Sequence, residues 1–174
     1  EYMGDPDEIV RFIADSEIVV DHLAPFSAEM FDRLKNLRFI AVSRGGPVNI
    51  DMAAARKSNV KVVNVPGRNA SAVAEFTIGA ILAETRLIRM GHESLRKGTW
   101  RGDLYRADVT GKELSQMTVG LIGYGQIGTR VVKLLKPFGC QILVCDPYVE
   151  LSEEDKENDV QPVSYTHLTL PTTS

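Results

Sequence analysis

The stretch TVGLIGYGQIGTRVV, residues 118–132, decides the fold of this chain. It begins as an apolar run typical of a buried strand, passes through Gly123, Gly125 and Gly128, and ends in a helical pattern. A second apolar run, QILVC, follows the helix and leads directly into Asp146. The order strand, glycine loop, helix, strand and acid predicts a βαβ unit that binds a dinucleotide.

Each glycine has a physical task in such a loop. Gly123 permits the tight turn from strand to helix, and Gly125, which has no side chain, lets a pyrophosphate approach the backbone. Gly128 lets the helix pack closely on the strand. The free N–H groups and partial positive charge of the helix N-terminus then face the phosphates. The alternative is a glycine-rich turn in an unrelated α/β sheet, and the matched context weighs against it.

Asp146 decides between the two nicotinamide dinucleotides. It stands 18 positions after Gly128, where a carboxylate accepts hydrogen bonds from a ribose 2′-hydroxyl. It would repel a 2′-phosphate by roughly 4 kcal/mol at most, the value for unit charges about 4 Å apart near a surface. We therefore expect NAD as the cofactor. Because Pro147 follows it, Asp146 also has the pattern of a turn residue, and both roles can hold together.

The composition argues against several classes of partner. The 174 residues are 44% hydrophobic and 25% charged, with a net charge of −3. We expect a globular protein that binds neither nucleic acid nor an anionic membrane surface. Cys140 and Cys145 flank a predicted strand and would point to opposite faces of it. This spacing predicts free thiols in a reducing cytoplasm rather than a disulfide or a metal site.

The first third of the chain alternates helical and strand patterns, which predicts a parallel sheet covered by helices. The predicted helices include one in which Ile9, Phe12 and Ile13 share a face, and one with Ser27 as its N-cap. The predicted strands lie within residues 17–22, 37–43 and 60–65.

A longer helix is predicted from about Ala72 towards Lys97, with Ser71 as its N-cap. Its first half is apolar nearly all round, which is typical of a helix buried between layers. A helix of this length can carry the chain from one domain to the next. We expect a partial substrate domain over residues 1–85, an inter-domain helix and linker over 86–110, and a partial NAD-binding domain over 111–162.

In these residues the chain resembles the D-isomer-specific 2-hydroxyacid dehydrogenases, the family that includes D-3-phosphoglycerate dehydrogenase. The resemblance rests on RGGPVNIDMAAARKSNVKVVNVPGRNASAVAEFTIGAILAETR (44–86), GKELSQMTVGLIGYGQIG (111–128) and FGCQILVCDPY (138–148). It implies an α/β fold in which part of a flavodoxin-like substrate domain is joined by the long helix to the first βαβ of a Rossmann NAD-binding domain. Substrate and nicotinamide would meet in the cleft between the domains, and the parent protein would be a homodimer.

The resemblance also assigns site residues. Cofactor contacts fall on the glycine loop and on the end of the second strand, at Gly123, Tyr124, Gly125, Gln126, Ile127, Gly128, Asp146 and Pro147. Contacts to a small 2-hydroxy or 2-keto acid fall on two other loops, at Arg44, Gly45, Gly46 and Asn69. Successive N–H groups in a glycine-rich loop suit a carboxylate. Many relatives carry Arg in place of Gln126, so a charged contact to the pyrophosphate is expected to be absent and cofactor affinity somewhat lower.

Simpler roles remain open for the substrate residues. The glycine pair before Pro47 also suits a plain turn, Arg44 a solvated surface charge, and Asn69 ordinary loop chemistry. His22 follows a predicted strand and suggests a general acid. A strand-end histidine with a hydrogen-bond partner is the simpler interpretation, because the family's catalytic histidine lies much later in the chain.

Reduction of a 2-keto acid needs residues that this sequence does not match. A cation must hold the carboxylate, an acid must protonate the carbonyl oxygen as hydride arrives, and a partner must set the pKa of that acid. In the family these are an Arg, a His and a carboxylate from the second half of the nucleotide domain. No residue in 1–162 corresponds to them, so no catalytic residue is assigned.

Both ends of the sequence lead us to expect a fragment. The chain opens on Glu1 rather than Met, and VSYTHLTLPT (163–172) reads as the translation of a common transposase sequencing adapter. We assign residues 163–174 to an adapter-derived tail and leave them out of the fold prediction.

The resemblance implies a parent protein that transfers a hydride between NAD and a small D-2-hydroxy acid or its 2-keto acid, whereas the fragment itself is expected to be inactive. Two alternatives share the fold without turnover. One is a corepressor of the C-terminal-binding-protein type, which uses the dinucleotide mainly to assemble, and the other is an NAD-binding sensor. A peptide groove in the substrate domain would favour the corepressor. The RGGP loop and the lack of a basic stretch favour a small polar cleft.

Overall fold

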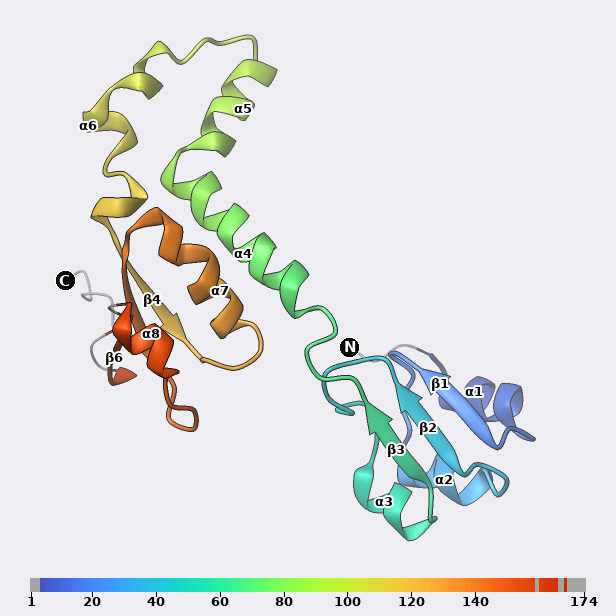
Figure 1. Ribbon diagram of the computed structural model, residues 1–174. Helices are drawn as coiled ribbons and strands as arrows, with labels where there is room; N and C mark the ends of the chain where they lie inside the picture. The colour runs from blue at the N-terminus through green and yellow to red at the C-terminus, as the bar shows by residue number, and fades with distance from the viewer. Residues whose placement is uncertain (1–3, 159, 166–167, 169–174) are drawn as a thin grey trace, which may run out of the picture. The chain divides into compact units, whose positions relative to one another are not determined.

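The computed structural model describes residues 4–158, 160–165 and 168 (Figure 1). These residues form two compact units, which divide between Arg68 and Asn69. Each unit contains a three-stranded parallel sheet. The predicted α/β class with parallel sheets is therefore confirmed.

Unit 1 is built on a sheet in the order β1-β2-β3. Its elements are α1 (Pro6–Ile13), β1 (Ile18–Asp21), α2 (Ala28–Arg33), β2 (Phe39–Val42), α3 (Met52–Lys57) and β3 (Lys61–Asn64). The alternation along β2 buries Ile40 and Val42 against Met30 and Phe31 of α2. Ser27 is the N-cap of α2, as predicted, although its side chain makes no capping hydrogen bond.

Ile9, Phe12 and Ile13 line one groove along α1, as their predicted common face implies, but Phe12 is not buried there. Val10 and Ile13, three residues apart, are buried, whereas Phe12 is 89% exposed. Phe12 borders an open apolar groove together with Ile9 and Val20. The helical pattern identified an apolar side chain correctly, but no described segment covers it.

Unit 2 carries the second sheet, in the order β4-β5-β6. Its strands and main helices are α4 (Ala70–Thr85), α5 (Ile88–Arg96), α6 (Ala107–Thr110), β4 (Thr118–Ile122), α7 (Gly128–Leu135), β5 (Gln141–Cys145), α8 (Glu153–Glu157) and β6 (Val160–Pro162). Short 3-10 turns occupy Gly102–Tyr105, Leu114–Gln116 and Lys136–Phe138. The 3-10 turn that follows α7 ends at Gly139, whose φ of 69° lies in the left-handed region.

The predicted single helix from residue 72 towards 97 is wrong in two respects. Asn69 rather than Ser71 is the N-cap, and the helix breaks at Leu87, whose φ is 54°. A left-handed residue cannot continue a right-handed helix, so α5 starts anew after it. In addition, α4 is buried on one face only: Ala74 packs in the core of unit 2, whereas Phe76 is 77% exposed.

The packing of α4 places the division between the units earlier than residue 85. α4 packs against α7, and its partly buried residues Ile78, Ile81 and Leu82 join the core of unit 2 (Figure 1). The helix therefore belongs structurally to the unit that follows it.

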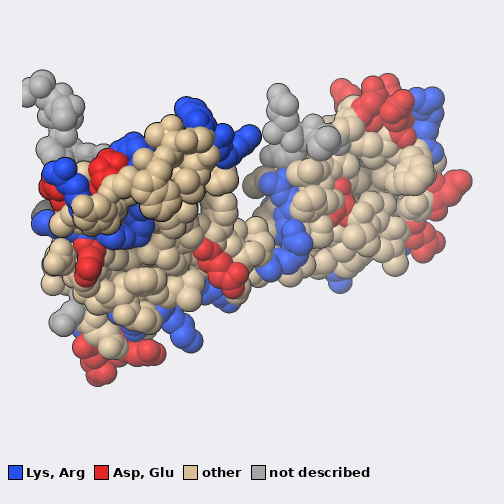
Figure 2. All heavy atoms as spheres, turned by 90° about the horizontal axis from the view of Figure 1, so that it is seen from above, with Lys and Arg blue, Asp and Glu red and all other residues tan. Residues whose placement is uncertain are grey.

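Residues 163–174 lie partly outside the described residues. Of those described, Val163 continues the pairing of β6, because its N–H donates to the carbonyl oxygen of Val144 at 2.9 Å. Among the described residues, no helix is both long and apolar enough to cross a membrane. Basic and acidic side chains are interspersed over both units on the face that Figure 2 shows.

Candidate functional site

The glycine loop has the geometry that the sequence predicts. Gly123 has a φ of 96°, and its N–H donates to the carbonyl oxygen of Cys145 at 2.8 Å, which ties the loop to the end of β5. A Cβ on Gly128 would lie 2.2 Å from the carbonyl oxygen of Gly123, so only glycine fits there. A Cβ on Gly125 would meet nothing within 4 Å, so the backbone is open to an approaching group.

Asp146 is held against this loop by backbone N–H groups. Its Oδ2 accepts from the N–H of Tyr124 at 2.7 Å, while its Oδ1 accepts from Tyr148 at 2.8 Å and Val149 at 3.0 Å. These three bonds, the one from Tyr124 foremost, lower the pKa of Asp146. The carboxylate is thus anionic at neutral pH and fixed beside the loop, and the turn after it, through Pro147, is also present.

The remaining cofactor residues divide into exposed and buried groups. Gln126 and Ile127 are exposed at the start of α7, as contacts to a ligand require. The side chain of Tyr124 points inward instead: the residue is 3% exposed, and its hydroxyl donates to Asp155 of α8. Tyr124 therefore contributes its backbone to the loop surface and its ring to the interior.

A cavity of about 370 Å³ opens beside Asp146 at the carboxyl ends of β5 and β6. Its lining combines the apolar residues Val144, Val149, Leu151, Pro162 and Val163 with the charged residues Asp146, Glu150 and Lys156. A flat apolar group with an attached sugar hydroxyl suits such a site, because carboxyl ends of parallel strands are where ligands bind in open α/β sheets. Sequence patterning gave no signal for this cavity, since its lining comes from three separate segments.

Unit 1 holds most of the predicted substrate residues. The loop of Arg44, Gly45 and Gly46 follows β2 and is fastened to the end of β3: Val65 N–H donates to the carbonyl of Arg44 at 2.9 Å, and Asn64 Nδ2 to that of Gly45 at 2.7 Å. Asn69, by contrast, opens unit 2 as the exposed N-cap of α4. The 44–46 loop is thus held in a fixed position beside the end of β3.

A buried polar pair joins Asn49 to the end of β1 and was not predicted. Asn49 Nδ2 donates to Asp21 Oδ2 at 2.5 Å and to the carbonyl oxygen of Ala24 at 2.7 Å. Both Asp21 and Asn49 are 5% exposed. The one available signal was an aspartate at the end of a strand, and it did not distinguish a structural aspartate from a functional one.

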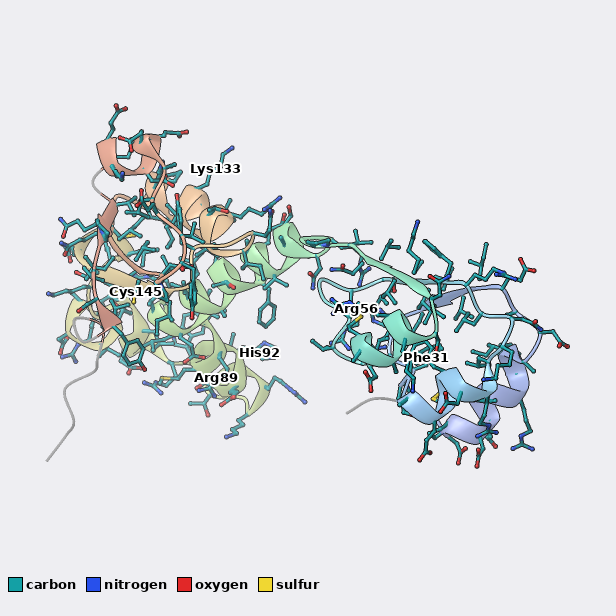
Figure 3. The ribbon with its side chains drawn as sticks, turned by 90° about the horizontal axis from the view of Figure 1, so that it is seen from below. Phe31, Arg56, Arg89, His92, Lys133 and Cys145 are labelled. Carbon is teal, nitrogen blue, oxygen red and sulfur yellow. The ribbon has the colours of Figure 1, made fainter. Side chains whose placement is uncertain are left out.

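The structure describes two histidines, His22 in unit 1 and His92 in unit 2. His22 Nδ1 lies 2.9 Å from Ser43 Oγ, which agrees with a strand-end histidine that has a hydrogen-bond partner. His92 lies exposed on α5 (Figure 3). Within the described part of the chain, no group of three or more His, Cys, Asp or Glu side chains could hold a metal ion.

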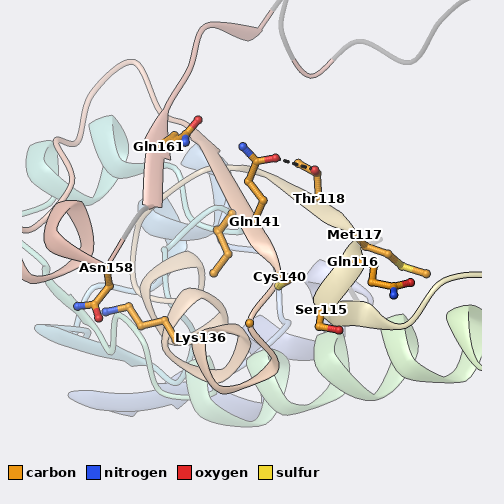
Figure 4. Close-up of a pocket in the computed structure, with 11 residues that line it drawn as sticks. Ser115, Gln116, Met117, Thr118, Lys136, Cys140, Gln141, Asn158 and Gln161 are labelled. Atoms are coloured by element: carbon orange, nitrogen blue, oxygen red, sulfur yellow. Dashed lines mark hydrogen bonds between the residues drawn. The ribbon is translucent and has the colours of Figure 1, made fainter.

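A second cavity of unit 2, about 580 Å³, lies at the other end of the sheet (Figure 4). Thr118 Oγ1 donates there to Gln141 Oε1 at 2.9 Å, and Lys136, Cys140 and Asn158 also line it. Burial raises the pKa of the Cys140 thiol, so this cysteine stays protonated and unreactive. None of the predicted site residues lines this cavity.

Comparison with known proteins identifies the glycine-loop half of the chain. Residues 78–170, more than half of the sequence, match the family model described as "D-isomer specific 2-hydroxyacid dehydrogenase, NAD binding domain". The match agrees with the expected cofactor, NAD, and with the Rossmann architecture of unit 2.

Relatives extend the similarity across both units. The chain is 36% identical over 164 residues to the hydroxypyruvate reductase of Thermotoga maritima, covering 88% of this chain and 52% of that protein. It is 35% identical over 144 residues to the D-3-phosphoglycerate dehydrogenase of Methanocaldococcus jannaschii, covering 82% and 27%. The solved structure of a D-2-hydroxyisocaproate dehydrogenase superposes with a TM-score of 0.77 at 29% identity, covering 97% and 49%. The chain thus spans about half or less of the length of these proteins.

Proposed function

The chain belongs to the D-isomer-specific 2-hydroxyacid dehydrogenase family, and on that premise we propose that the whole protein is an NAD-dependent oxidoreductase of small D-2-hydroxy acids and their 2-keto acids. The observation that carries the proposal is the hydrogen bond from the Tyr124 N–H to Asp146, which joins the glycine loop to its acid. When bound, NAD supplies or accepts the hydride.

The residues of unit 2 bind and orient the cofactor in this proposal. Gly125 leaves room for the pyrophosphate, and the N-terminus of α7 offers it free N–H groups. Asp146 accepts a hydrogen bond from the ribose, with the adenine in the neighbouring 370 Å³ cavity. In unit 1, the loop of Arg44 to Gly46 holds the carboxylate of the substrate.

The remaining chemistry lies with residues that this chain does not match. We assign the cation, the proton donor and its carboxylate partner to the part of the relatives' length that the chain does not span. The 174-residue chain alone is therefore expected to be inactive. Turnover of glyoxylate, hydroxypyruvate or phosphohydroxypyruvate by the purified chain, followed as NADH oxidation, would overturn this assignment.

The cofactor site is tested by titration of the chain with NADH and NADPH. Asp146→Ala removes the ribose acceptor and the charge that repels a 2′-phosphate, so we expect weaker NADH binding and a smaller preference over NADPH. Asp32→Ala removes an exposed aspartate from unit 1 and serves as the control. Equal affinities of the two variants for NADH would place the cofactor elsewhere.

We further propose that the whole protein is a cytoplasmic homodimer. Leu95, Trp100 and Tyr105 are 58%, 80% and 87% exposed and line an open apolar cavity of about 400 Å³ in unit 2. A second copy would bury this surface. Sedimentation velocity on the chain and on Trp100→Ala tests the surface: a dimer that the substitution dissociates supports it, and an unchanged dimer contradicts it. The free thiols of Cys140 and Cys145 support a reducing compartment.

A further inference from the structure

Arg130 lies one helical turn after Gln126 and reaches back over the glycine loop. Its Nη1 donates to the carbonyl oxygen of Gln126 at 2.5 Å and to the side-chain Oε1 of Gln126 at 2.9 Å. Side chains on a helix lean towards its N-terminus, so a residue in the first turn of α7 can reach the loop that precedes it. The positive charge of Arg130 is therefore held beside Gln126, which follows Gly125 of the glycine loop.

The guanidinium has capacity left for an anion. Arg130 forms no salt bridge with a carboxylate within the described part of the chain. Both of its recorded hydrogen bonds use Nη1, and a guanidinium has five N–H donors in a fixed fork. Its other donors are available to phosphate oxygens, which Arg binds as paired acceptors.

The contact also orients Gln126. Because Oε1 accepts from Arg130, the amide nitrogen of Gln126 is the end of that side chain left to donate. Gln126 directly follows Gly125, where the backbone is open and a Cβ would meet nothing within 4 Å. The guanidinium of Arg130 and the amide of Gln126 thus lie together at the start of α7, directly after the glycine loop.

We propose that Arg130 binds the pyrophosphate of NAD and that Gln126 is the bridge that holds it there. The proposal rests on the proposed function, in which this loop holds NAD. Arg130 then supplies, from the helix, the charged contact expected to be absent at Gln126. The same charge is attracted to any nucleoside diphosphate and makes no contact that a nucleoside without phosphate would need.

The test compares binding of ADP, adenosine and NADH to the 174-residue chain, measured by NMR titration or calorimetry. Arg130→Met is expected to weaken ADP and NADH roughly five- to tenfold and to leave adenosine unchanged. Lys133→Met is the matched control, because Lys133 is an exposed cation on the same helix (Figure 3). Arg130→Lys keeps the positive charge but lacks the planar guanidinium with its paired donors. We expect its affinity for ADP and NADH to lie between those of the unaltered chain and Arg130→Met.

The outcomes distinguish the proposal about Arg130 from the proposed NAD site on which it rests. If the unaltered chain binds neither NADH nor ADP, or if Asp146→Ala has no effect on either, the cofactor site is wrong and the role of Arg130 fails with it. If Asp146→Ala weakens binding but Arg130→Met and Lys133→Met have equal effects, only the assignment of Arg130 is overturned. An equal loss of adenosine binding in Arg130→Met would also overturn it. Unchanged circular dichroism of each variant excludes misfolding as the cause.

Discussion

The hydroxyl of Tyr124, inside the glycine loop, donates a hydrogen bond to the carboxylate of Asp155 on α8. Lys136, at the end of α7, pairs with the same carboxylate at 2.5 Å. Tyr124 and Asp155 are both buried, at 3% and 8% exposure. One buried cluster therefore ties together the glycine loop, the end of the helix that follows it, and α8. The glycine loop is thus anchored to the interior of unit 2.

Removing the Tyr124 hydroxyl is expected to destabilise unit 2. Tyr124→Phe leaves the buried Asp155 carboxylate without one donor, at a cost of about 1–3 kcal/mol in the free energy of unfolding. Amide hydrogen exchange at Val132 and Leu135, both in the core of unit 2, measures it. Tyr148→Phe, at a residue that is 93% exposed, is the control and should stay within about 0.5 kcal/mol of the unaltered chain.

The stability of unit 2 is expected to fall in acid because of Asp155. Burial raises the pKa of this carboxyl, but hydrogen bonds from Lys136 and Tyr124 outweigh it, and the net pKa lies below the ordinary value of 3.8. A depressed pKa stabilises the fold above the unfolded value, and that stability is lost as the pH falls below about 4 through the folded pKa. Urea midpoints measured between pH 7 and pH 2.5 should show a steeper loss for the unaltered chain than for Asp155→Asn. Parallel curves would mean that Asp155 is not the group responsible.

Gly128 and Gly79 are expected to respond in opposite directions to the same substitution. Gly128→Ala places a Cβ 2.2 Å from the carbonyl oxygen of Gly123, so the loop must shift, at about 1–3 kcal/mol or more. Gly79→Ala meets nothing within 4 Å and removes a weak helix former from α4, a gain of roughly 0.5–1 kcal/mol. Urea unfolding followed by circular dichroism compares the two. A tolerated Gly128→Ala would contradict the close approach of helix and loop.

Unit 1 is expected to depend on the buried pair of Asp21 and Asn49. Asn49→Ala removes the side-chain amide that donates to the Asp21 carboxylate and to the Ala24 carbonyl oxygen. We expect the free energy of unfolding of unit 1 to fall by about 1–3 kcal/mol. Exchange at the amides of Ile40 and Val42 reports on this unit alone, because both lie in its core. Asn36→Ala, at an exposed position, is the matched control. Faster exchange confined to unit 2 would be inconsistent with the pair's role.

Local sequence was sufficient for much of unit 2. The run from β4 through Gly123, Gly125 and Gly128 into α7 and β5 formed as predicted, because strand, turn and helix here each depend on neighbouring residues. The helix starting at residue 70 shows where local signals fail. Asn69 and Ser71 are both good N-caps by residue type, and the burial of Ala70 and Ala74 accompanies the earlier start.

The sequence also left the side-chain partners of the site undecided. The spacing of Gln126 and Arg130, four residues apart on a helix, permitted their contact but did not require it. The resemblance assigned Tyr124 to the cofactor contacts, and only the structure shows that its ring is buried and that its hydroxyl reaches Asp155, 31 residues later.

The sequence by itself determined the fold class, the dinucleotide loop and the acid that closes it, because these depend on residue types at short, fixed spacings. Only the tertiary structure decided which residue begins α4 and which groups inside unit 2 stabilise the glycine loop. It also decided that the side chains of Phe12 and Phe76 remain exposed. The physical reason is the same in each case. Burial and hydrogen-bond partners depend on segments distant in the chain, and no local pattern specifies which of them will meet.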